Sequence, residues 1–187
     1  PQLSTLVNCW RQSGQTILCL VPEGALATQL SGLYPQLSIS RELVIDALTI
    51  KILPFMPQDD YDKLLWACDI NFVRGEDSII RAHWAGKPFI WQIYRQQQQA
   101  HLEKLNAFML RYCAQMPVDT CEAVQQFWLQ WNTDGLLDKS WQKFSANLVQ
   151  IAEYNRLWRV ALTANGDLAS NLVHFVEKKF IMRRNFS

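Results

Sequence analysis

The stretch Arg-Gly-Glu-Asp-Ser at residues 74–78 is the part of the sequence whose residue types best fit ligand chemistry. It stands between the apolar run DINFV and the helical pattern of IIRAHWAG, where a strand gives way to a helix. Gly75 has no β-carbon, so it allows a sharp turn and a close approach of the backbone to a ligand. The amides of Glu76, Asp77 and Ser78 would be the unpaired donors of a helix N-terminus, and Arg74 adds a planar guanidinium suited to phosphate oxygens. A phosphate would fit this arrangement.

The two carboxylates in this stretch complicate a simple phosphate site. Glu76 and Asp77 would repel a phosphate at contact distance, but they could accept hydrogen bonds from sugar hydroxyls, as an acid does with ribose in dinucleotide folds. A nucleotide or a sugar nucleotide would satisfy both halves of the stretch. In the alternative interpretation the acids and Ser78 only cap a helix, and Arg74 only pairs with a surface carboxylate. A single glycine is a weak phosphate signature, so the residues alone leave both interpretations open.

Two other predicted strands end in residues suited to a nucleobase. Phe55 and Gln58 follow one strand, and Tyr94 ends another. An aromatic face can stack on a base, and an amide can read its hydrogen-bonding edge. Each residue alone also fits a capped core aromatic or a polar helix start. Because ligands collect at the carboxyl ends of parallel strands, we expect these residues to share one rim with residues 74–78.

No complete catalytic apparatus is visible in the sequence. His83, His101 and His174 show no metal-ligand spacing. Nothing resembles a nucleophile elbow or a catalytic triad. We therefore expect a binding site without a metal or other cofactor.

Strands and helices alternate through the first half of the chain and predict the sheet that holds this rim. Short apolar runs predict strands at residues 16–22, 47–55, 69–73 and 87–94. Helical spacing predicts helices at residues 2–12, 24–34, 58–68 and 76–86, the last closed by Gly86. This order implies right-handed crossovers and an α/β fold, with a parallel sheet covered by helices on both faces.

The second half of the chain predicts helices alone, at residues 100–113, 119–131, 136–162 and 167–180. In the longest of them, apolar residues recur along one face: Phe144, Leu148, Ile151, Trp158 and Leu162. We interpret this stripe, together with Trp128, Trp131 and Trp141, as core packing rather than as cofactor contacts. The tract RQQQQ at residues 95–99 predicts a solvated loop.

The composition excludes several classes of partner. With 187 residues the chain has room for one core, and its net charge of +1 argues against a nucleic-acid partner. No apolar run approaches the roughly 20 residues of a membrane span, so no membrane partner is expected.

The cysteines at positions 9, 19, 68, 113 and 121 make no CxxC pair and lie in apolar segments, which predicts buried free thiols in a reducing cytoplasm. The first residues, PQLSTLVNCW, look like a helix without an initiator Met, so we expect a fragment of a longer protein.

Two segments, LPFMPQDDYDKLLWACDINFVRGEDS and RAHWAGKPFIWQIY, resemble the carboxy-terminal half of the EarP family, the bacterial elongation factor P arginine rhamnosyltransferases. The similarity runs from CLVPEGAL to GDLASNLVHFVEKKF. It implies an inverting glycosyltransferase of GT-B type whose carboxy-terminal, Rossmann-like domain binds dTDP-β-L-rhamnose. The family passes rhamnose to an arginine of elongation factor P, which relieves ribosomes stalled on polyproline. No metal takes part.

The resemblance also implies roles for individual residues. Phe55 and Gln58 match the thymine pocket, and Tyr94 matches a tyrosine that contacts the donor. The family motif that binds the ribose and diphosphate of the donor is matched by Arg74, Glu76, Asp77 and Ser78, around the turn at Gly75. The resemblance also implies that Glu76 supports activity.

The family's general-base aspartate belongs to an amino-terminal domain that we expect to be absent from this chain. Residues 1–187 would then be the donor domain, with residues 136–187 as a helical extension. We expect such a fragment to bind dTDP or dTDP-rhamnose without turnover, and residues 167–180 and the tail MRRNFS to be displaced or frayed. The remaining alternatives are another GT-B-like enzyme, such as a nucleotide-sugar epimerase, and a non-catalytic α/β interaction module.

Overall fold

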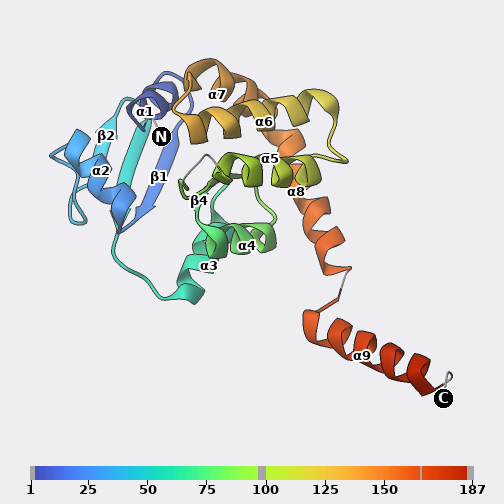
Figure 1. The fold of residues 1–187 in the computed structure, drawn as a ribbon. Helices are drawn as coiled ribbons and strands as arrows, with labels where there is room; N and C mark the ends of the chain where they lie inside the picture. The colour runs from blue at the N-terminus through green and yellow to red at the C-terminus, as the bar shows by residue number, and fades with distance from the viewer. Residues whose placement is uncertain (1–2, 97–99, 165, 185–187) are drawn as a thin grey trace.

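The computed structural model describes residues 3–96, 100–164 and 166–184, with side chains described as far as residue 177. It confirms the α/β class: the first half of the chain alternates strands with helices, and the second half is helical (Figure 1). The loop predicted at residues 95–99 falls largely outside the described residues, because 97–99 are not among them.

The strands form two small sheets instead of one continuous parallel sheet. In the first, β1 (Ile17–Pro22) runs parallel to β3 (Leu48–Leu53). The other edge of β3 pairs with β2 (Leu43–Ile45), a three-residue antiparallel strand that we did not predict. In the second sheet, β4 (Asn71–Arg74) runs parallel to β5 (Phe89–Gln92). Among the described residues no ladder joins β4 or β5 to β1, β2 or β3, so these strands form two sheets and the expectation of a single sheet is wrong.

The helices of the first half begin and end close to the predicted residues. They are α1 (Leu3–Arg11), α2 (Ala25–Leu33), α3 (Gln58–Ala67) and α4 (Glu76–Ala85). Helix α4 ends at Gly86, whose φ of 65° is left-handed, as the sequence predicts for a helix-terminating glycine. Helix α4 packs against α3 and β4, and α2 against β1.

The second half contains α5 (Ala100–Tyr112), α6 (Val118–Thr133), α7 (Leu137–Ala146), α8 (Leu148–Thr163) and α9 (Leu168–Arg184). The predicted continuous helix at residues 136–162 is broken at Asn147 and forms α7 and α8. The Asn147 amide donates to the Lys143 carbonyl and its oxygen accepts from the Thr120 hydroxyl. An asparagine that bonds locally in this way competes with helix continuation.

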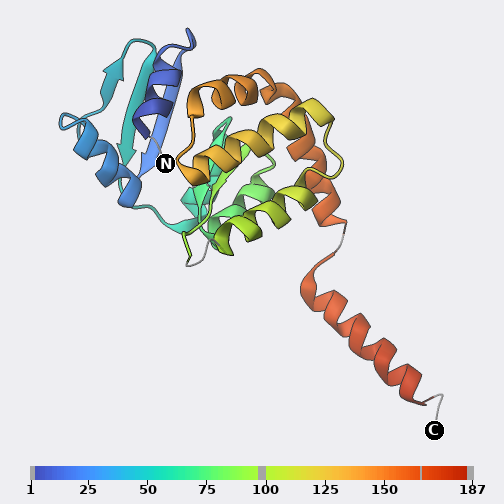
Figure 2. The ribbon, with the colours of Figure 1, turned by 45° about the horizontal axis from the view of Figure 1, so that its top comes forward.

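Helix α9 extends away from the rest of the molecule (Figures 1 and 2). Its apolar side chains as far as residue 177 are exposed, and Leu168 is 84% and Phe175 59% accessible. This matches the expectation that residues 167–180 would be displaced, although they form a regular helix. The last three residues of the tail lie outside the described part of the chain. Across the described helices, none combines the length and apolar character that a bilayer crossing requires.

An aromatic core joins the β4–β5 sheet to the carboxy-terminal helices. The rings of Phe108, Tyr112 and Trp128 stack nearly parallel, with centroids 5.5–6.0 Å apart. Phe89, on β5, packs against Tyr112 and Trp128 at 5.3 and 5.2 Å. The interpretation of the tryptophans as core residues is confirmed, since Trp128, Trp131 and Trp141 are all buried.

All five cysteines are free thiols, but only Cys113 is fully buried, so the expectation of buried thiols is only partly correct.

Asn132, on α6, is buried against the free edge of β5. Its side-chain oxygen accepts from the Ile93 amide at 2.9 Å, and its amide donates to the Trp91 and Trp128 carbonyls at 2.8 Å. The side chain thus supplies the hydrogen bonds that a neighbouring strand would make. It fixes the end of β5 just before Tyr94.

Candidate functional site

The turn at Gly75 connects the end of β4 to the first residue of α4, as the sequence predicts. Its φ of 85° and ψ of −177° belong to a region that only glycine adopts readily. A β-carbon there would lie 2.7 Å from Cε2 of Tyr94, so the ring also requires glycine. The Gly75 carbonyl accepts a bond from the Trp91 indole at 2.9 Å, and its amide donates to the Gln92 carbonyl at 3.2 Å. These contacts hold the turn from both sides.

Arg74 and Tyr94 come together beside this turn. The guanidinium carbon of Arg74 lies 4.9 Å from the centre of the Tyr94 ring, a cation–π distance. Both side chains are exposed. The N-cap of α4 is Gly75, which has no side chain to bond the first amides of the helix. A guanidinium and these amides therefore lie next to each other, a combination that suits an anion.

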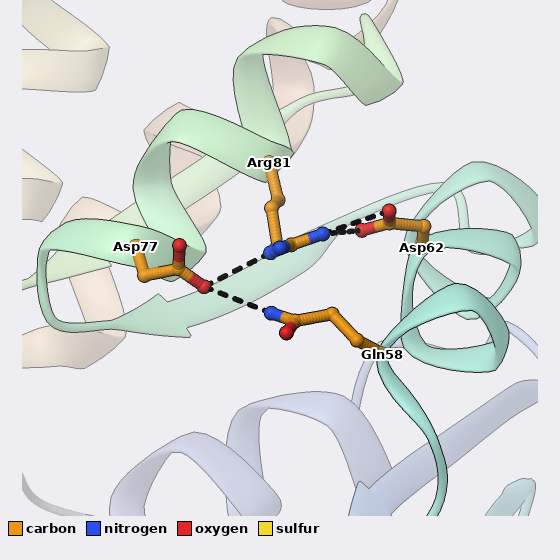
Figure 3. A network of polar contacts seen from close by, with 4 residues as sticks. All are labelled: Gln58, Asp62, Asp77 and Arg81. Carbon is orange, nitrogen blue, oxygen red and sulfur yellow. Dashed lines mark hydrogen bonds and ion pairs between the residues drawn. The ribbon is translucent and has the colours of Figure 1, made fainter.

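Asp77 belongs to a polar network between α3 and α4 (Figure 3). Its Oδ2 accepts from Nε of Arg81 at 2.9 Å and from Nε2 of Gln58 at 3.1 Å. Arg81 in turn donates from Nη1 to both carboxylate oxygens of Asp62, at 2.9 and 2.8 Å. Helices α3 and α4 are thus tied together by Arg81 and by the bond from Gln58 to Asp77.

Glu76 forms an ion pair with Lys104 of α5. Each acid of the stretch 74–78 therefore has a cationic partner, Lys104 for Glu76 and Arg81 for Asp77. From the sequence we expected these two carboxylates to repel a phosphate at contact distance, and in the structure each is paired with a cation. The paired carboxylates leave Arg74 and the helix amides as the dominant groups facing an anion.

A cavity of about 300 Å³ opens next to the first turn of α4. It is lined by Pro22, Glu23, Phe55, Met56, Gln58, Tyr61, Asp77 and Ser78. The lining comes from the segments that follow β1, β3 and β4, so the cavity lies at the carboxyl ends of strands from both sheets. Ligands of parallel α/β folds bind at the carboxyl ends of the strands, and the cavity lies at this position.

Phe55 stands at this cavity with 84% of its side chain exposed, so it is not a core aromatic. Its backbone amide donates to Oε2 of Glu23 at 3.2 Å, which ties the loop after β3 to the end of β1. An exposed ring on a tethered loop is available for stacking on a flat ligand.

Tyr61 and Ser78 both line the cavity. Burial raises the pKa of Tyr61, and the neighbouring Ser78 hydroxyl and the charge of Arg81 act in the opposite direction. Tyr61 therefore stays a neutral phenol at physiological pH and can act as a hydrogen-bond partner only.

The structure brings the predicted site residues together in two adjoining groups. Phe55, Gln58, Asp77 and Ser78 line the cavity. Arg74, Gly75, Glu76 and Tyr94 form the turn and the exposed surface next to it. The first turn of α4 belongs to both groups, so one extended ligand could contact the two.

Sequence reasoning missed five residues of the site: Glu23, Tyr61, Asp62, Arg81 and Lys104. The spacing of Asp77 and Arg81, four residues apart on a helix, is a signal that could have revealed their ion pair. Lys104 lies 28 residues from Glu76, and no local pattern connects them.

A larger hollow of about 560 Å³ lies between α5, α6 and α7, lined among others by Leu110, Leu129 and Lys143. It contains none of the predicted residues. Its polar groups include the ion pair between Lys143 and Glu122, which are already matched to each other. In the described part of the chain, no three His, Cys, Asp or Glu side chains gather in a metal-binding group. We therefore place the candidate site at the smaller cavity.

Comparison with known proteins agrees with the resemblance noted in the sequence. The family described as Elongation-Factor P (EF-P) rhamnosyltransferase EarP matches residues 1–177. A protein-arginine rhamnosyltransferase of Pseudomonas aeruginosa is 42% identical over 177 residues, which cover 94% of this chain and 47% of the relative. A protein-arginine rhamnosyltransferase of Shewanella oneidensis is 34% identical over 184 residues, which cover 95% of this chain and 47% of the relative.

A solved structure from a study of EarP-mediated arginine glycosylation of translation elongation factor EF-P superimposes with a TM-score of 0.85 at 37% identity. The match covers 95% of this chain and 57% of that one. The chain spans about half the length of the curated relatives it matches.

Proposed function

The chain belongs to the EarP family of EF-P rhamnosyltransferases, and from this premise we propose that it is the donor-binding half of a protein-arginine rhamnosyltransferase. In this proposal it binds dTDP-β-L-rhamnose, and the complete enzyme transfers the sugar to an arginine of elongation factor P in the cytoplasm. One observation carries the proposal: a cavity of about 300 Å³ adjoins the uncapped start of helix α4, whose amides suit an anion, at the carboxyl ends of the strands.

The proposed roles follow the two groups of residues. Phe55 stacks on the thymine, Gln58 reads its edge, and Asp77 and Ser78 contact the ribose. Arg74 and the first amides of α4 hold the diphosphate, with Tyr94 beside Arg74. Lys104 keeps the charge of Glu76 compensated, which leaves Glu76 close to the diphosphate and the sugar without a net repulsion.

We propose that residues 1–187 form one GT-B-type donor domain with residues 136–187 as its helical extension. The reaction would be a direct displacement at the anomeric carbon with inversion and without a metal. The bond from that carbon to the diphosphate oxygen breaks as the guanidinium nitrogen attacks. Arg74 and the α4 amides stabilise the charge that develops on the departing diphosphate. Guanidinium is a poor nucleophile because its lone pairs are delocalised, so the acceptor needs a carboxylate base from the other half of the enzyme.

Titration of the 187-residue chain with dTDP and dTDP-rhamnose tests the proposal. We expect both to bind and to raise the melting temperature. Arg74→Ala and Ser78→Ala should weaken binding, Arg74→Ala by about tenfold or more, because a charge-assisted bond contributes roughly 1.5–3 kcal/mol. Arg156→Ala is the matched control, since Arg156 makes an exposed ion pair with Glu153 on α8, away from the site. If neither ligand shifts the amide spectrum or the melting temperature, the donor-binding proposal fails.

The complete enzyme provides the second test. Incubation with elongation factor P should give a mass increase on the acceptor that requires dTDP-rhamnose and is lost with Glu76→Ala. The isolated chain should give none. An epimerase would instead convert free sugar nucleotide without a protein acceptor, and that result would contradict the transferase assignment.

A further inference from the structure

We propose that Arg81, anchored by Asp62, is a positioning residue that fixes the amide of Gln58 through Asp77, so that the site selects an imide base such as thymine or uracil over cytosine. The inference rests on the proposed function, because it names how the same cavity chooses its nucleotide. Neither Arg81 nor Asp62 lines the cavity, so both would act only through other residues.

Arg81 is rigidly held for a side chain near the surface. Nη1 contacts both oxygens of Asp62 on α3 and Nε contacts Asp77 one turn earlier on α4, all within 2.8–2.9 Å. The side chains of Arg81 and Asp62 are only 25% and 28% exposed, whereas that of Asp77 is 73% exposed. The exposed carboxylate of Asp77 thus depends on a better buried ion pair for its orientation.

The carboxylate of Asp77 decides which way the amide of Gln58 faces. An ionised carboxylate only accepts hydrogen bonds, so the Gln58 atom at 3.1 Å from Oδ2 must be the donor Nε2. The carbonyl oxygen Oε1 then points away from Asp77 (Figure 3). No residue in the described part of the chain donates a hydrogen bond to this oxygen. Because Gln58 lines the cavity, it offers a ligand there an acceptor.

An acceptor in this place distinguishes the pyrimidine bases. Thymine and uracil carry an N–H donor at N3, which an amide carbonyl can accept. Cytosine carries a lone pair at N3, which would face the same carbonyl without a bond. A site built to hydrogen-bond one group discriminates strongly against an analogue that lacks it, because its polar atom is left unpaired.

Removal of Arg81 would free this arrangement. Asp77 is exposed and would lose the partner that orients it, so its carboxylate could turn away from Gln58. The amide of Gln58 could then rotate by 180° to present Nε2 to the base. The rotated amide donates to N3 of cytosine as readily as the native one accepts from thymine. The expected consequence is a loss of discrimination rather than a general loss of nucleotide binding.

The test measures the affinities of the 187-residue chain for dTDP, dUDP and dCDP, three ligands that share sugar and diphosphate. The unchanged chain should bind dTDP and dUDP at least about tenfold more tightly than dCDP, as expected for one unpaired polar group. In Arg81→Gln the ratio should fall to within about threefold, mostly by tighter dCDP binding. Arg81→Lys keeps one ion pair and should restore part of the ratio. Arg156→Gln, at the exposed pair on α8, should leave the ratio unchanged.

The possible results separate the two proposals. Equal weakening of all three nucleotides in Arg81→Gln would show a merely structural role and overturn the inference. Equal binding by the unchanged chain would overturn it while leaving donor binding intact. If no nucleotide binds, both proposals fall. Asp62→Asn removes the anchor without touching Arg81, so it supplies a second variant if Arg81→Gln does not fold. Its ratio should fall as well, and an unchanged ratio would contradict the proposed anchoring.

Discussion

The two ends of helix α4 lie in opposite environments. At the first turn, Glu76, Asp77 and Ser78 face solvent or the cavity, and the charges of Glu76 and Asp77 are matched by cations from other turns and helices. At the last turn, the ring of His83 lies 5.0 Å from Phe89, 5.6 Å from Phe108 and 6.1 Å from Trp158. The same ten-residue helix is thus polar and accessible at one end and enclosed by aromatic rings at the other.

This difference shows how the fold holds a binding surface steady. The aromatic end fixes the direction of the helix axis, because α4 packs against α8 and β4 there and the Trp158 indole donates to Nδ1 of His83 at 3.2 Å. The open end can then present its amides at a fixed position without contributing much to stability. We expect substitutions at the buried end to change the free energy of unfolding and those at the open end to change ligand affinity.

The largest expected effect is a loss of folding stability in acid, caused by His83 at the buried end of α4. Burial lowers the pKa of His83 from 6.5 to about 4. Below pH 6.5 the unfolded chain takes up this proton and the folded chain does not. The free energy of unfolding should therefore fall as the pH drops from about 6.5 to 4, by up to about 3 kcal/mol from this group. Above pH 6.5 the histidine is neutral in both states and adds no pH dependence.

Urea unfolding at pH 7 and pH 4 measures this contribution. His83→Gln keeps an acceptor for Trp158 but does not titrate, so its loss of stability in acid should be smaller than that of the unchanged chain. His174→Gln is the matched control at an exposed histidine of α9 and should behave like the unchanged chain. The same acid loss in His83→Gln as in the unchanged chain would contradict the neutral, buried state of His83.

A smaller effect should separate the two glycines that flank α4. Gly75→Ala places a methyl group 2.7 Å from Tyr94 in a backbone region that disfavours side chains, at a cost of about 1–3 kcal/mol. We expect it to displace Tyr94 and Arg74 and to weaken dTDP binding. Gly86→Ala meets only the flexible Arg159 side chain, at 3.2 Å, and should cost about 1 kcal/mol without a change in affinity.

Isothermal titration and thermal unfolding of both variants measure the two costs. If Gly86→Ala lost affinity for dTDP and Gly75→Ala kept it, the proposed division between a binding end and a stabilising end of α4 would be wrong.

The smallest expected effect comes from the ion pair that balances Glu76. Lys104→Met leaves Glu76 unpaired near the proposed diphosphate, and we expect dTDP to bind about two- to fivefold more weakly, since an exposed pair contributes below about 1 kcal/mol. The deficit should shrink at high salt because screening weakens the repulsion. Lys143→Met removes a similar exposed pair with Glu122 and should leave affinity unchanged. A loss of affinity that is the same at low and high salt would argue against charge as the cause.

The sequence was sufficient for features that depend on neighbours in the chain. Gly75 and Gly86 were predicted at the two ends of α4 because a turn and a helix end make strict local demands. The rim of Phe55, Gln58 and Tyr94 followed from the rule that ligands collect at the carboxyl ends of strands.

Other features depend on contacts between distant segments and could not be predicted. The strand β2 has three residues, too few for a periodic signal, yet it takes the outer edge of β3 and adds an antiparallel strand to the sheet. The apolar stripe at residues 136–162 continued through Asn147, whose side-chain bonds break the helix. Likewise, the partner of Glu76 lies on another helix, so only the tertiary structure shows that its charge is neutralised.

The side chain of Asn132 has a consequence for the behaviour of the chain in solution. A two-stranded sheet offers open backbone groups along its outer strands, and such edges can recruit strands from other molecules. At β5, an amide from α6 already occupies the Trp91 carbonyl and the Ile93 amide. A single polar residue thereby blocks intermolecular β-pairing at this edge, and it does so from within the core, where no surface charge is needed.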